Sequence, residues 1–137
     1  QLAMNNAGVP TLGDHGWDLF RILYLAEREY DRALASDATW QAARGALGFG
    51  NYDRTAASNL ADGNDFMLVA TSYITGKDQR PFFDMWGVSY SGVAAAQVAS
   101  FGFPQVAKSY WVIPNEDVFS DPLPTPLPID GTTGWPY

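Results

Sequence analysis

The most strongly periodic segment of the sequence is GWDLFRILYLAEREYDRALA, residues 16–35. Its apolar side chains recur every three or four residues, as on the inner face of an amphipathic helix, at Leu19, Leu23, Ala26, Tyr30 and Ala33, with Phe20, Ile22 and Leu34 widening the stripe. Arginines and carboxylates occupy the other side, where they can pair one turn apart. We therefore expect a helix over 16–35, capped by Asp14, with one face on a core.

A second, shorter helix is expected over residues 38–47. Ser36 or Asp37 can cap its start, because both side chains accept hydrogen bonds from free amides of a first turn. The glycine- and asparagine-containing residues 50–53 then predict a turn.

Two more helices are expected later in the chain. Residues 66–75 have helical spacing and end at Gly76, although their β-branched side chains lower the helix preference. Residues 93–100 are rich in alanine and can be capped by Ser89 or Ser91. Their small side chains would allow another helix to approach closely.

Between these two lies a short aromatic segment. Asp78 can cap it, and Pro81 fits the first turn of a helix. The spacing predicts that Phe82, Phe83 and Trp86 are buried.

The chain changes character after residue 105. Alternation over 106–113 predicts a short strand, and the prolines of 114–137 exclude a helix and favour an extended chain. This tail should pack on the bundle or on a neighbouring molecule, through its apolar side chains Leu123, Leu127, Ile129 and Trp135. The expected fold is therefore all-α, with a helical unit over 1–113, a short β-strand segment, and an extended Pro-rich tail over 114–137.

Composition excludes several classes of function. The 137 residues are 47% hydrophobic and 15% aromatic, enough for one packed core. A net charge of −7 with scattered basic residues argues against nucleic-acid binding. Cysteine is absent, so a disulfide framework and a thiolate metal site are excluded, and no apolar run approaches the length of a membrane span.

Several groups resemble reactive sites, but a structural role fits each better. Residues 87–92 lack the second glycine of a nucleophile elbow, and a helix rather than a strand precedes them. His15 beside Asp14 is the single histidine, too few ligands for zinc. Residues 62–65 lack the spacing of an EF-hand loop, and the carboxylates within 27–31 lie on a solvated helix face. We therefore assign no catalytic, cofactor-binding or metal-binding residue to this chain.

Five tryptophans offer possible ligand contacts. Trp17, Trp40 and Trp86 occupy apolar helical positions, so we expect them in the core. Trp111 and Trp135, with Tyr137, are less constrained by periodicity.

Two stretches carry a family resemblance: residues 16–29, with GWDLF leading into LAERE, and residues 72–87, with SYITGKD leading into RPFFDMWG. They resemble the helical region downstream of the metal site in the enhancin-like, mucin-targeting zinc metallopeptidases, the peptidase M60-like family. The resemblance covers residues 1–112. It implies that the Trp17 helix, the helix end at Gly76 and the segment 82–87 belong to a subdomain behind the active-site cleft.

In that family a His-Glu-x-x-His helix binds zinc and its glutamate activates the attacking water. This chain lacks the motif. The resemblance therefore implies a non-catalytic helical part of a secreted zinc metallopeptidase that cleaves mucin-type glycoproteins. The zinc would lie in the parent protein, and the partners would be the rest of that protein and, through it, the glycoprotein substrate. The start Gln1-Leu2-Ala3-Met4 is apolar and resembles the middle of a helix, which we interpret as the mark of a fragment.

An alternative interpretation has no enzymatic role. Exposed aromatic side chains and the Pro-rich tail would then make the chain a stand-alone module that binds a protein or a glycan.

Overall fold

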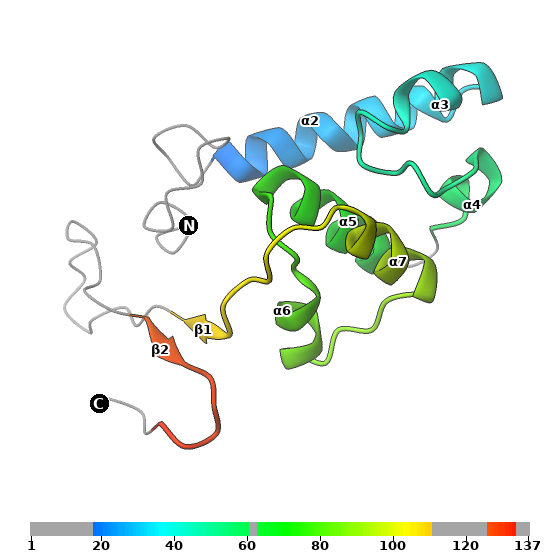
Figure 1. The fold of residues 1–137 in the computed structure, drawn as a ribbon. Coiled ribbons are helices and arrows are strands. Elements are labelled where there is room, and N and C mark those ends of the chain that lie inside the picture. The colour runs from blue at the N-terminus through cyan, green and yellow to red at the C-terminus, as the bar shows by residue number, and fades with distance from the viewer. Residues whose placement is uncertain (1–17, 61–62, 111–125, 134–137) are drawn as a thin grey trace.

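The computed structural model describes residues 18–60, 63–110 and 126–133. Its helices and strands, in chain order, are α2 (Asp18–Ala33), α3 (Asp37–Ala43), α4 (Arg54–Ser58), α5 (Gly63–Thr75), α6 (Arg80–Met85), α7 (Gly92–Ser100), β1 (Ser109–Tyr110) and β2 (Leu127–Pro128) (Figure 1). The all-α class is thus confirmed. Several positions with a role expected from the sequence lie outside the described residues: Asp14, His15, Trp17, Asp62, Trp111, Leu123, Trp135 and Tyr137.

The long amphipathic helix is confirmed as α2. Asp18 stands in its first turn and pairs with Arg21 at 3.1 Å. Tyr30 and Ala33 are buried, as the apolar spacing predicts. The helix ends at Ala33, two residues before the predicted end, because Ser36 begins the next helix.

The helix α3 starts as predicted and ends early. Ser36 is its N-cap and forms a capping box with Thr39. Beyond Ala43 the chain continues through turns to Gly48, whose φ of 85° lies in the left-handed region. A Cβ at Gly48 would lie 2.7 Å from Cγ of Tyr73, so glycine also allows the close approach to α5.

The helix α4 was not predicted. Asp53, which the sequence places in a turn, caps α4 by accepting a hydrogen bond of 2.7 Å from the Ala56 amide. Five residues are too few to show a helical period.

The core is built around aromatic rings from several elements. Tyr30 meets the rings of Trp40, Phe49 and Phe66 edge-on, at centroid distances of 5.2, 4.8 and 5.2 Å. Their polar atoms are satisfied: the Tyr30 hydroxyl donates to the Ala57 carbonyl at 2.9 Å, and Trp40 Nε1 donates to the Tyr52 carbonyl at 2.9 Å. The predicted burial of Trp40 is confirmed, since its exposure is 0%.

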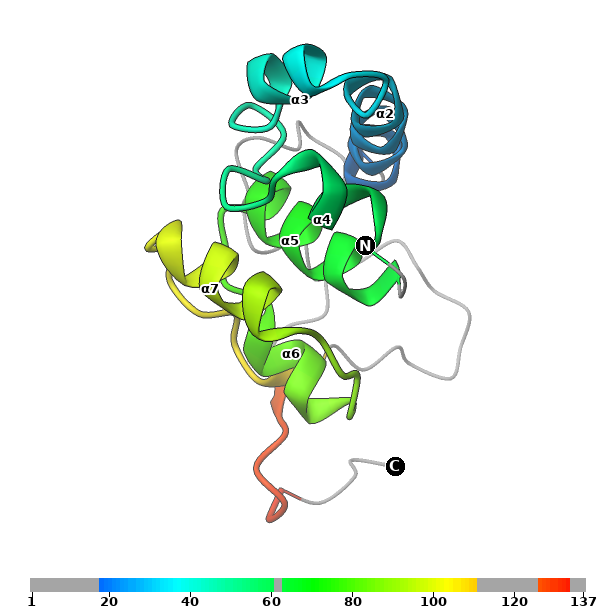
Figure 2. The same cartoon turned by 90° about the vertical axis from the view of Figure 1, so that its right-hand side faces the viewer.

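The predicted helix over 66–75 is confirmed as α5, which lies at the centre of the fold. Figure 2 shows α5 between α2 and α7, and it packs extensively against both of them. Leu68 and Val69 are fully buried on this helix. Ser91, rather than Ser89, caps α7 through the Ala94 amide at 3.1 Å.

Two predictions about the aromatic segment are wrong. Phe82 and Trp86 are 42% and 63% exposed, whereas Phe83 packs against the core. The short helix α6 turns Pro81 and Phe83 inward, which leaves residues one turn apart on the opposite side facing outward. Asp78 is also not the N-cap, because Gln79 occupies that position without a side-chain hydrogen bond.

A small antiparallel pairing joins the end of the helical unit to the tail. Ser109 pairs with Pro128 and Tyr110 with Leu127, and the Ile129 amide donates to the Lys108 carbonyl at 2.8 Å. The predicted strand over 106–113 is seen at Ser109–Tyr110, and its last three residues lie outside the described part. The division between 113 and 114 stays a prediction.

Candidate functional site

The connection between α5 and α6 is fixed by an ion pair whose carboxylate is buried. The Asp78 side chain is 4% exposed, and its Oδ2 lies 2.7 Å from Nη2 of Arg80. The Arg80 amide also donates to Asp78 Oδ1, at 3.0 Å. The hydrogen bonds from Arg80 hold the pKa of Asp78 below its usual value, against the opposing effect of burial.

The same residue ties this connection to the chain that leaves α7. The Asp78 amide donates to the Pro104 carbonyl and the Val106 amide donates to the Asp78 carbonyl, both at 2.9 Å. The start of α6 is therefore anchored at both backbone and side chain.

The far end of α6 is braced by a tyrosine. The Tyr90 hydroxyl donates to Oδ1 of Asp84 at 2.7 Å, and its ring lies edge-on to Phe83 at 6.2 Å. Burial and the hydrogen bond to Asp84 raise the pKa of Tyr90 to about 12, so the phenol is neutral at physiological pH. Gly87, with φ of 65°, ends the helix.

This bracing presents two rings to solvent, which we call the α6 face: Phe82 and Trp86. Their centroids are 6.2 Å apart and their planes are inclined by 59°. Trp86 is among the most exposed large hydrophobic side chains of the described residues. The sequence predicts both rings in the core of this unit. That prediction is wrong because helical spacing indicates an apolar face but does not say which polypeptide covers it.

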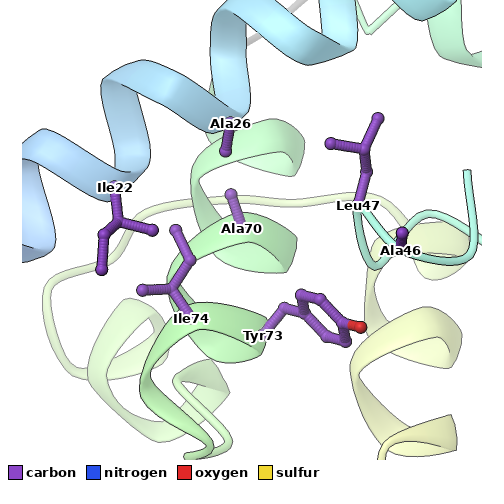
Figure 3. A pocket seen from close by; sticks show the side chains of 7 residues that line it. All are labelled: Ile22, Ala26, Ala46, Leu47, Ala70, Tyr73 and Ile74. Atoms are coloured by element: carbon purple, nitrogen blue, oxygen red, sulfur yellow. The ribbon is translucent and has the colours of Figure 1, made fainter. Parts of the chain in front are cut away.

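An open apolar hollow of about 300 Å³ lies between α2 and α5. Figure 3 shows its lining: Ile22 and Ala26 of α2, Ala46 and Leu47 of the segment after α3, and Ala70, Tyr73 and Ile74 of α5. Space arises because alanine side chains face each other where the helices approach. The hollow offers apolar contact rather than acid–base chemistry.

Asn64 and Asp65, for which the sequence favours a structural role over calcium binding, link the starts of two helices. Asp65 accepts hydrogen bonds from the amide and the hydroxyl of Ser91, and Asn64 donates to the Ser89 carbonyl at 3.0 Å. These bonds join the start of α5 to the start of α7. The Ser91 hydroxyl caps α7. The segment before it follows the helix α6, whereas a nucleophile elbow follows a strand.

The other chemical groupings also have structural positions. Glu27, Glu29 and Asp31 are exposed on α2, and Arg32 pairs with Glu29. Among residues 18–60, 63–110 and 126–133 there is no cluster of three or more histidine, cysteine or acidic side chains placed to hold a metal ion. No helix of those same ranges has the length and apolar character to cross a membrane.

Comparison with known proteins identifies one relationship. No family model matches the chain. The immunomodulating metalloprotease of Pseudomonas aeruginosa is 32% identical over 126 residues, which are 89% of this chain and 13% of that protein.

Solved structures give the same result. The IMPa metallopeptidase in complex with T-antigen is 35% identical, with a TM-score of 0.69, over 89% of this chain and 14% of that one. The structure of IMPa from Pseudomonas aeruginosa in complex with an O-glycopeptide is 34% identical, with the same TM-score and shares. The chain is therefore a partial homologue of a metallopeptidase, similar along most of its own length to one segment of the Pseudomonas immunomodulating metalloprotease.

Proposed function

We propose that this chain is the non-catalytic helical unit of a secreted zinc metallopeptidase that cleaves mucin-type glycoproteins, and that it supports the wall of the active-site cleft. The observation that carries the proposal is the identity of 34–35% at a TM-score of 0.69 with a metallopeptidase solved with T-antigen and with an O-glycopeptide. The matched segment is a small part of that enzyme, so its activity and substrates come to this chain only as a proposal.

The residue composition of the chain favours a structural role over a catalytic one. One histidine and no cysteine cannot supply the ligands of a catalytic zinc site, and the His-Glu-x-x-His motif is absent from the sequence. The zinc and its activated water would belong to the rest of the parent protein. A rigid aromatic core, with Trp40 and Phe49 fully enclosed, suits a surface that keeps distant ligands in position.

The test replaces the homologous segment of the Pseudomonas metallopeptidase by this chain. We expect the chimaera to retain zinc and to cleave an O-glycopeptide, and the 137-residue chain alone to do neither. A matched chimaera with Trp40→Ala, which removes a core ring, should lose activity together with thermal stability. Robust cleavage by the isolated, zinc-loaded chain would refute the proposal.

The exposed α6 face favours one further candidate, the stand-alone binding module. In that case the isolated chain would bind T-antigen or a glycopeptide, and Trp86→Ala would weaken binding without unfolding the chain, because this ring is outside the core. Titration of the chain with both ligands separates the two functions.

A further inference from the structure

The α6 face is apolar and exposed, and the helix that carries it is anchored at both ends. Trp86 and Phe82 are one helical turn apart, 63% and 42% exposed, and in contact with each other rather than with the core. Burial of such rings is favourable, which makes an adjacent exposed pair a candidate contact site.

The supports behind these rings are rigid. Pro81 is buried on the inner side of α6, the Asp78–Arg80 pair fixes its start, and the Tyr90–Asp84 hydrogen bond fixes its end. A partner would therefore meet a surface that is already ordered, so little conformational entropy would be lost on contact. Tryptophan in such a position is typical of the energetic centre of a protein interface.

The neighbouring polar groups favour a protein surface over a sugar. Part of the hydrogen-bonding capacity beside the rings is used within the fold, since Arg80 is engaged with Asp78 and Oδ1 of Asp84 accepts from Tyr90. A sugar would need such groups, whereas an apolar protein surface needs none. A second copy is disfavoured because each chain carries a net charge of −7.

The partner that covers the α6 face is inferred from the length of the related proteins. The segment that matches this chain is 14% of the solved metallopeptidase chain, so most of that polypeptide lies outside the fold described above. We infer that the α6 face is the surface by which this unit docks on an apolar patch of the catalytic part of a larger metallopeptidase. This inference rests on the proposed function and names the contact through which the support acts.

Hydroxyl-radical footprinting of the chimaera described above, read by mass spectrometry, tests the docking surface directly. We expect the oxidation rate of Trp86, fast in the 137-residue chain alone, to fall in the chimaera to the level of the buried Trp40. In the chimaera, Trp86→Ser should also lower the melting temperature, whereas Val93→Ser, a matched change at an exposed residue of α7, should not. Trp86→Ser should leave the melting temperature of the isolated chain unchanged.

The two proposals can fail separately. A chimaera that cleaves the O-glycopeptide while Trp86 stays as reactive as in the free chain overturns the docking inference and leaves the proposed function standing. Protection of Trp86 in the free chain that grows with protein concentration would assign the face to a second copy. Protection that appears only on adding T-antigen would assign it to a glycan, and either result also overturns the inference.

Discussion

Replacing Gly48 by alanine should strongly destabilise the fold, for two reasons that add. The residue has a φ of +85°, and a side chain in this left-handed region costs about 1–2 kcal/mol. The new Cβ would also lie 2.7 Å from Cγ and 3.0 Å from Cβ of Tyr73. Part of the Tyr73 ring can swing outward, but its Cβ is fixed to α5, so relief needs a backbone shift that costs about 1–3 kcal/mol. We expect a total loss of about 3 kcal/mol, a large part of the stability of a small domain.

Two other glycines separate these contributions. Gly76 has a φ of +63°, and a Cβ added there would have no atom within 4 Å, so Gly76→Ala tests backbone strain alone and should cost about 1–2 kcal/mol. Gly45 has open space and no positive φ, so Gly45→Ala should change stability by no more than about 0.5 kcal/mol.

The assay is urea unfolding of the 137-residue chain, followed by far-ultraviolet circular dichroism. In a Tyr73→Ala background the contact with Cγ is removed and only the 3.0 Å contact between the two Cβ atoms stays, so the excess cost of Gly48→Ala over Gly76→Ala should shrink. If Gly48→Ala and Gly76→Ala destabilise the wild-type chain equally, the close packing of the α3–α4 connection on α5 is wrong.

Three further predictions concern caps and buried ionisable groups. Ser91→Ala removes the α7 cap and a partner of Asp65, so it should cost about 1–2 kcal/mol in urea unfolding, and an unchanged midpoint would contradict the capping geometry. Burial raises the pKa of Tyr52 to about 12 from 10.0, so this neutral phenol stabilises the fold below pH 10 and that contribution is lost as the pH rises toward 12. Because its hydroxyl has no hydrogen-bond partner among the described residues, Tyr52→Phe should be nearly neutral at pH 7 and should reduce the alkaline loss of stability seen by circular dichroism. Hydrogen bonding to Arg80 lowers the pKa of Asp78 below its ordinary value of 3.8, so the ionised Asp78 stabilises the fold above pH 3.8 and this stabilisation is lost as the pH falls below that value. In Asp78→Asn the free energy of unfolding should therefore fall less steeply on acidification, and an unchanged acid dependence would contradict this prediction.

Much of the fold can be predicted from periodicity and caps. The stripe that ends at Tyr30 and Ala33 is long enough to define α2, and Ser36 begins α3 because its hydroxyl meets a free amide three residues on. Gly76 ends α5, as predicted, and its φ is positive. These signals are local, so a single sequence carries them.

Features that depend on neighbours distant in the sequence could not be predicted. The helix α4 is too short for a period, and it is positioned in part by the Tyr30 hydroxyl, which bonds the Ala57 carbonyl across 27 residues. The close approach of Gly48 to Tyr73 of α5 likewise joins segments that are distant in the sequence. Such contacts exist only after the helices have packed.

The exposure of Phe82 and Trp86 shows a limit of helical spacing as a predictor of burial. An aromatic pair one turn apart is expected to be covered by apolar atoms, but the pattern does not say whether these belong to the same folded unit. Here the unit's own core is occupied by Tyr30, Trp40 and Phe49, and α6 turns Phe83 rather than its neighbours toward it. The apolar spacing and the outward orientation of the two rings agree if another part of a larger protein covers them. Footprinting of Trp86 measures that contact.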